Sequence, residues 1–167
     1  MMTINYLAES EKYRPKKILT LLVGEAPPPS RKTYFYMPNS MRVKKEIEKD
    51  SNLPATIFNH YFGKRPENDV DYILFLRELQ RNGIFLIDIC DEPLRVRNSP
   101  EGLQRIIDEI PMLRGKMKRR KISIHDEDIV FLLARHNYKK FLKKAFPVSH
   151  MIRWIDFRMS PGQEGSS

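Results

Sequence analysis

Cysteine and long apolar stretches are nearly absent from this chain of 167 residues. The only cysteine is Cys90, which excludes an internal disulfide, a zinc ribbon and a cysteine-ligated iron–sulfur cluster within one chain. No apolar run approaches the ~20 residues that cross a bilayer. Residues 1–17 carry charge and lack the apolar segment of a secretion signal. We therefore expect no membrane contact and no secretion.

Signatures of bound metals and nucleotide cofactors are also missing. The histidines lack the spacing of metal ligands such as H-E-x-x-H, so we predict no metal site and no cofactor. The chain has neither a Walker loop nor G-x-G-x-x-G, so triphosphate and dinucleotide chemistry have no support. The histidines are His60, His125, His136 and His150.

Basic residues are in excess and are concentrated in the second half of the chain. Hydrophobic residues make up 41%, which suffices for a core, and 30 Lys and Arg against 21 Asp and Glu give a net charge of +9. Residues 114–121 contain six basic residues in eight with no acid, and residues 135–158 contain seven against one. This pattern favours a nucleic-acid partner, although a solvated helix face with a basic loop explains it equally well. The candidate contacts to a DNA backbone are Arg114, Lys116, Lys118, Arg119, Arg120 and Lys121.

Four apolar segments have the length and flanks of β-strands. They cover residues 17–23, 84–89, 128–134 and 152–159. The last alternates apolar with polar residues, which is typical of an edge strand with one solvated face.

Helical patterns lie between these strands. The clearest covers residues 70–80 and ends at Asn82-Gly83, and another begins at Ser99-Pro100 and is bent or ended by Pro111. We expect further helices over residues 40–50 and 137–145, a helical turn after Pro54 and a basic loop over residues 114–121.

Strands that alternate with helices predict one fold class. We expect a single α/β domain over residues 1–167, with a four-stranded parallel sheet between two helical layers. In such sheets ligands bind beyond the carboxyl ends of the strands. This rule selects residues 24–30, 88–93, 135–137 and 160–163.

Short motifs at these strand ends give a family resemblance. The first strand followed by Gly24-Glu25-Ala26-Pro27 resembles motif A of the uracil-DNA glycosylase superfamily, in the branches that read Gly-Glu-Ala-Pro. Residues 34–36 lie where that family has a ring that stacks on a flipped base, and residues 160–163 lie where it has motif B. The chain departs from the family at Arg158-Met159, where motif B normally begins with His, and at Asp88, where the family often has Asn.

The resemblance implies removal of uracil or another damaged base by hydrolysis of its N-glycosidic bond. Glu25 would position the water as the catalytic residue, and Tyr34, Phe35 or Tyr36 would stack on the base. Asp88 would contact the base, and because a carboxylate only accepts hydrogen bonds it suits an exocyclic amine better than O4 of uracil. Ser160, Gly162 and Gln163 would contact phosphate or sugar.

Each of these residues also has an ordinary structural interpretation: a loop hydrogen bond, core packing, a cap or a turn. The hypothesis is a monomeric repair protein that binds damaged or single-stranded DNA and lies in the cytoplasm, the nucleoid or the nucleus. Two alternatives stay open. One is a nucleic-acid-binding relative without catalysis, and the other is a different α/β enzyme that acts on a small anionic substrate.

Overall fold

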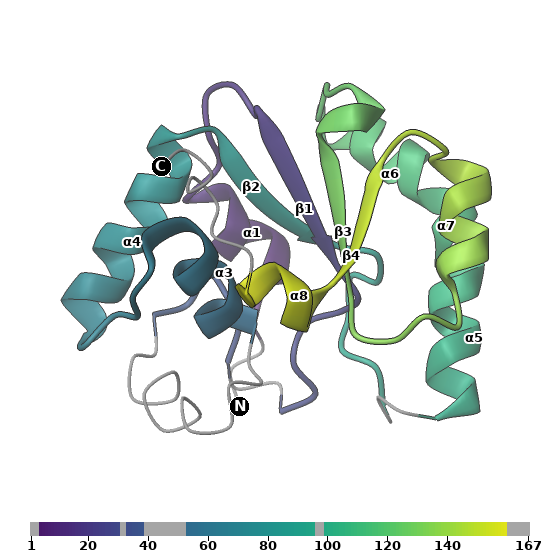
Figure 1. Ribbon diagram of the computed structural model, residues 1–167, viewed down its shortest axis with the longest axis horizontal. Coiled ribbons are helices and arrows are strands. Elements are labelled where there is room, and N and C mark those ends of the chain that lie inside the picture. Colours follow the sequence, from purple (N-terminus) through teal and green to yellow (C-terminus); the bar gives the residue numbers. More distant parts are fainter. Residues whose placement is uncertain (1–3, 31–32, 39–52, 96–98, 160–167) are drawn as a thin grey trace.

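Four parallel strands form the centre of the protein (Figure 1). The structure is a computed structural model that describes residues 4–30, 33–38, 53–95 and 99–159. The strands are β1 (Thr20–Gly24), β2 (Ile84–Asp88), β3 (Ile129–Leu133) and β4 (His150–Arg153), in the order β2-β1-β3-β4. Leu22 at the middle of β1 lies opposite Leu86 of β2 and Val130 of β3. The predicted parallel α/β/α class is confirmed.

Helices cover both faces of this sheet. Figure 1 shows α3, α4 and α8 on one side and α5, α6 and α7 on the other. The bounds are α1 Tyr6–Glu11, α3 Leu53–Phe62, α4 Asp69–Arg81, α5 Pro100–Glu109, α6 Leu113–Arg119, α7 Lys139–Ala145 and α8 Trp154–Met159, with 3-10 turns at Ile110–Met112 and Asp126–Asp128.

Local sequence signals set the ends of several helices, as predicted. The side chain of Ser99 accepts the Gly102 N–H at the start of α5, where Pro100 occupies the first turn. Gly83 has a φ of 76° and makes the turn from α4 into β2, a conformation that favours glycine. Pro111 lies in the 3-10 turn that separates α5 from α6.

Two expectations about the second half of the chain are wrong. The strand predicted over residues 152–159 ends at Arg153, and α8 follows because buried Phe157 stacks on His60 of α3, with ring centroids 3.6 Å apart. The basic loop predicted over residues 114–121 is mostly α6, because Leu113 and Met117 recur at helical spacing and are buried under its charged residues.

Three smaller differences concern the first half of the chain. Pro54 lies in the first turn of α3, where proline is tolerated, and does not interrupt the segment. Helix α1 was not predicted from the sequence, although Asn5 caps it by accepting the Ala8 N–H. The helix expected over residues 40–50 lies outside the described residues.

The outer edge of β2 is closed by the aromatic segment 34–36. The Tyr36 hydroxyl accepts the Leu86 N–H at 2.7 Å, and the Tyr36 ring stacks on Tyr13 at 5.8 Å between centroids. An edge strand leaves such N–H groups unpaired unless something covers them. Tyr36 therefore has a structural role at the sheet edge.

We predict that Tyr36→Phe lowers the free energy of unfolding by about 1–3 kcal/mol, because the buried Leu86 N–H loses its acceptor. Urea denaturation measures the change. Tyr61→Phe is the control, since no hydrogen bond of the Tyr61 hydroxyl is found within the described residues. Equal stability of the two variants would contradict the role given to Tyr36.

Candidate functional site

A cavity of about 720 Å³ lies between α1, α6 and the carboxyl end of β2. Its wall also includes Pro27 from the loop after β1 and the segment that follows β2, namely Cys90, Asp91 and Glu92. Five residues that the sequence singled out line this one cavity: Tyr34, Asp88, Lys116, Arg119 and Arg120.

Asp88 is placed in this wall by its neighbour on β1. Gly24 and Asp88 are partners in the strand register, and a Cβ atom on Gly24 would lie 2.8 Å from Oδ1 of Asp88. Any side chain at position 24 would displace this carboxylate. The first residue of the Gly-Glu-Ala-Pro motif thus makes room for Asp88.

Lys116 joins α6 to the end of β2. Its Nζ donates to the carbonyl oxygens of Asp88 at 2.6 Å and Ile89 at 2.9 Å, and to the Asp91 carboxylate at 2.8 Å. The Lys116 side chain is only 10% exposed. The sequence predicted a DNA-backbone contact here, but the ammonium points inward and binds the protein itself.

The two arginines of the wall differ in their availability to a ligand. Arg120 is 15% exposed in its side chain and donates to Ser10 Oγ at 3.1 Å and to the Glu11 carboxylate at 2.9 Å. Arg119 is exposed, and among the described residues its guanidinium has no ion pair. Arg119 is therefore the cation of this wall that can meet an anionic ligand.

Aromatic side chains supply a further part of the wall. Tyr34 contacts Tyr6 of α1 edge to face, with ring centroids 5.0 Å apart, and both rings line the cavity. Burial, and then the nearby Asp88 carboxylate, raise the pKa of Tyr34, so it stays a neutral phenol. Phe35 is packed in the core, where its carbonyl accepts the Tyr72 hydroxyl at 2.7 Å. Of the three aromatic candidates, only Tyr34 lines the cavity.

Glu25 lies beside this cavity but its carboxylate is directed toward β3. The Glu25 carbonyl accepts the Cys90 N–H at 2.9 Å, whereas Oε2 accepts the Tyr138 hydroxyl at 2.6 Å. Nη2 of Arg135 lies 3.5 Å from Oε1, which has no hydrogen bond among the described residues. Burial, followed by the Glu25 charge, raises the pKa of Tyr138, so Tyr138 remains the donor.

This Glu25 cluster occupies the point where the strand order reverses. The chain passes from β1 to β2 on one side and from β2 to β3 on the other, so β1 and β3 flank the switch point at which α/β sheets commonly bind ligands. The prediction that residues 135–137 lie at this edge identified the region, but it did not single out Arg135 or Tyr138 as partners of Glu25.

Other site predictions have a simpler outcome. Ser160, Gly162 and Gln163 lie outside the described residues. Burial raises the pKa of Cys90 to about 12, so this cavity residue is a thiol and a poor nucleophile. Sequence reasoning missed Tyr6 and Ser10 because α1 itself was missed; the available signal was Asn5, a residue type favoured at helix N-caps.

Neither a metal-binding group nor a membrane-spanning helix is present in the described part of the chain. There, no group of three or more His, Cys, Asp or Glu side chains could hold a metal ion. Over the same residues, every helix is too short or too polar to cross a bilayer.

Comparisons with known proteins add no assignment. No protein family, curated protein or solved structure matches this chain. What this protein does must therefore be inferred from the geometry of the cavity and the chemistry of its wall.

We predict that Lys116→Met lowers the free energy of unfolding by about 2–4 kcal/mol, because the carbonyl groups at the end of β2 lose their donor. Lys118→Met on the same helix is the matched control, since Lys118 is exposed, and should change stability by less than about 0.5 kcal/mol. Chemical denaturation measures both. A Lys116→Met protein as stable as the control would show that the ammonium does not hold α6 to β2.

Proposed function

We propose that this protein binds a nucleic-acid strand, with DNA as the preferred partner, and holds one unstacked base in the cavity between α1 and α6. The observation that supports this is the convergence of Tyr34, Asp88 and Arg119 on one wall of the cavity. An aromatic surface, a hydrogen-bond acceptor and a cation are the three elements that hold a base and its phosphate. The net charge of +9 favours the same partner.

The carboxylate of Asp88 determines which base fits best. A carboxylate accepts hydrogen bonds and cannot donate, so it pairs best with an exocyclic amine; the ring N3–H of thymine or uracil could also donate to it, but that group lies between two carbonyl oxygens. The O4 atom of uracil or thymine would face it with repulsion. The proposal is therefore that the cavity prefers a base with an exocyclic amine, such as cytosine, over thymine or uracil.

The size of the cavity suits a nucleotide. Small-molecule sites generally enclose about 300–1,000 Å³, and the cavity encloses about 720 Å³. Its wall combines the aromatic rings of Tyr6 and Tyr34 with polar groups of both signs, so a flat polar ring can be held together with its anionic phosphate.

Hydrolysis of the N-glycosidic bond by Glu25 stays a prediction from the family resemblance. The reaction needs a carboxylate that holds water at the anomeric carbon of the bound nucleotide. The Glu25 carboxylate is 2% exposed and is bonded to Tyr138 on the β3 side. We therefore propose binding without base removal as the function, which is the non-catalytic alternative among the sequence-based hypotheses.

The first test is the base preference of binding. We expect fluorescence anisotropy to show that the protein binds labelled oligo-dC about tenfold more tightly than oligo-dT of equal length, the effect of one hydrogen bond to a charged group. Asp88→Asn should bring this ratio close to one, because an amide presents both a donor and an acceptor.

The control is Asp108→Asn, which removes one negative charge from the exposed face of α5. It should leave the dC-to-dT ratio unchanged, and using a ratio cancels the general effect of the lost charge on DNA affinity. A wild-type ratio near one would refute the role of Asp88. Failure to bind any oligonucleotide at low salt would refute the proposed function and favour a small anionic substrate.

The second test asks whether the bound base is removed. We expect wild-type protein incubated with a uracil-containing oligonucleotide to leave no alkali-labile sites. If such sites form, and folded Glu25→Gln protein does not produce them, then the protein is a glycosylase and binding is only the first step of its function. Circular dichroism of the variant checks that it is folded.

A further inference from the structure

Helix α6 has a second hollow on another of its faces. A groove of about 500 Å³ is lined by three basic residues, Arg114, Lys118 and Lys121, and by the apolar residues Met117, Ile122 and Ile124. Arg114 and Lys118 are four residues apart and so share one face of α6, and Lys121 follows just after the end of the helix. Lys116, Arg119 and Arg120 line the cavity instead. The predicted DNA contacts thus divide into two sets on different faces of one helix.

Of the three basic residues that line the groove, Arg114 is bound to other parts of the protein, whereas the two lysines can meet a ligand. The Arg114 guanidinium donates to both oxygens of Asp126 and to the Ala145 carbonyl at 2.8 Å. The same pairing holds the pKa of Asp126 below its usual value. Lys118 and Lys121 are exposed, and in the described ranges their ammonium groups have no hydrogen bond or ion pair.

Lys121 has an unfavourable backbone conformation. It ends α6 with a φ of 56°, and around it the Ile122 N–H bonds to the Met117 carbonyl and the Lys121 N–H to the Lys118 carbonyl. This pair of hydrogen bonds is the Schellman arrangement, in which the residue at this position is usually glycine. A lysine here is strained, and its side chain lines the groove.

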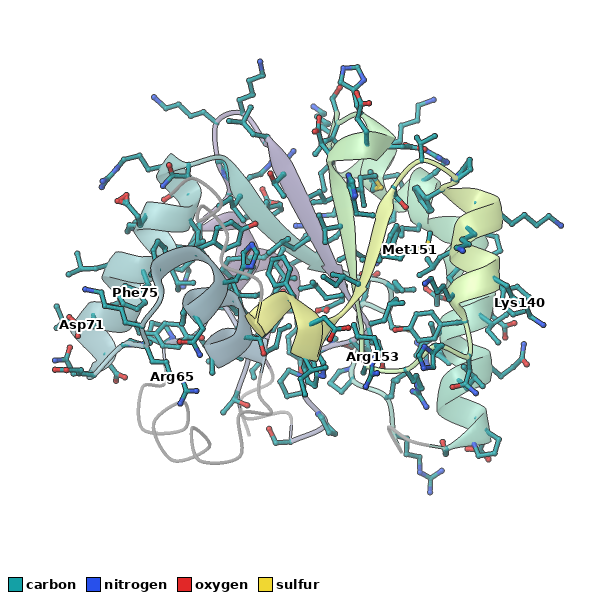
Figure 2. The ribbon with its side chains drawn as sticks, in the orientation of Figure 1. Arg65, Asp71, Phe75, Lys140, Met151 and Arg153 are labelled. Atoms are coloured by element: carbon teal, nitrogen blue, oxygen red, sulfur yellow. The ribbon has the colours of Figure 1, made fainter. Side chains whose placement is uncertain are left out.

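A residue that is held in a strained backbone conformation, although another residue type would stabilise the fold, often contacts a ligand. The positive φ at position 121 favours glycine. The lysine found there supplies an exposed ammonium beside Lys118 that can bind a phosphate. The solvated-face interpretation of the basic residues is stronger on α7, where Lys140 is exposed and extends outward (Figure 2).

We propose that this groove is a second phosphate subsite and that one single strand passes over α6 from the cavity to the groove. This inference rests on the proposed function of the cavity. An α-helix with its side chains is ~10–12 Å across, so the two hollows are separated by roughly that thickness. Duplex DNA has a persistence length of ~50 nm, so bending it around such an obstacle costs several kcal/mol, whereas a single strand bends with little cost. The structure thus points to single-stranded nucleic acid as the substrate class.

The test compares a short and a long ligand. The dinucleotide dC2 fills the cavity alone, and a 12-residue oligo-dC reaches both hollows. We expect Lys118→Gln with Lys121→Gln to weaken binding of the 12-mer about tenfold at low salt, to reduce the slope of log K against log salt by about 1.4, and to leave dC2 binding unchanged. Lys64→Gln with Arg81→Gln is the control, because both residues are exposed, Lys64 just after α3 and Arg81 at the end of α4. Figure 1 shows α3 and α4 on the side of the sheet opposite α6. A duplex of the same length should bind more weakly than the single strand.

Lys121→Gly separates the binding role from a structural one. Relief of the strained φ should raise Tm by about 2–4 °C, while loss of the ammonium should weaken 12-mer binding several-fold. A gain in Tm with unchanged 12-mer affinity would overturn the subsite.

The outcomes distinguish this inference from the proposed function. If Asp88→Asn and Arg119→Gln alter dC2 binding but the groove variants leave the 12-mer unaffected, the second subsite is wrong and the cavity stands. Tighter binding of the duplex than of the single strand would refute the path over α6. If wild-type protein binds neither ligand, both proposals fail.

Discussion

The Lys116 ammonium is the contact on which the arrangement of this protein depends. The carbonyl groups at the carboxyl end of β2 point beyond the sheet, and Lys116 binds those of Asp88 and Ile89 together with the Asp91 side chain. This fixes the rotation of α6 about its axis. One face of the helix then closes the cavity with Arg119, and another carries the groove with Lys118 and Lys121. From composition alone, Lys116 is expected to contact a ligand. In the structure its charge instead positions the other charged residues of α6.

Sequence patterns predicted the sheet well because its strands are short apolar runs bounded by glycine, proline or charge. They failed where long-range contacts decide the structure. The local sequence does not reveal that Phe157 stacks on His60. Without knowledge of that contact, the alternation of apolar and polar residues over 152–159 indicates an edge strand. The run at residues 114–121 was assigned to a loop because its density of charge hides the spacing of Leu113 and Met117. The rule that ligands bind at the carboxyl ends of strands led to residues that line the cavity, such as Asp88, since this rule depends only on topology.

The candidate site could be predicted only in part, because residue type does not fix direction. The strand-end rule selected Glu25 and Asp88, and the family resemblance added Tyr34, yet their side chains belong to two different clusters. Asp88 and Tyr34 line the cavity, whereas the Glu25 carboxylate turns toward Tyr138 and Arg135. The Tyr36 hydroxyl accepts the Leu86 N–H at the edge of the sheet. What a parallel sheet supplies is an edge where polar groups gather; which neighbouring strand each one faces depends on packing.

The central claim is that the hollows beside α6 receive a single nucleic-acid strand. The most direct measurement is an NMR titration of ¹⁵N-labelled protein with a single-stranded oligo-dC. The account predicts that the largest amide shifts occur at Asp88 to Glu92 and along α6 to Ile124, the segments that border the cavity and the groove. Shifts confined to α4 or α7, or none at saturating oligonucleotide, would contradict it.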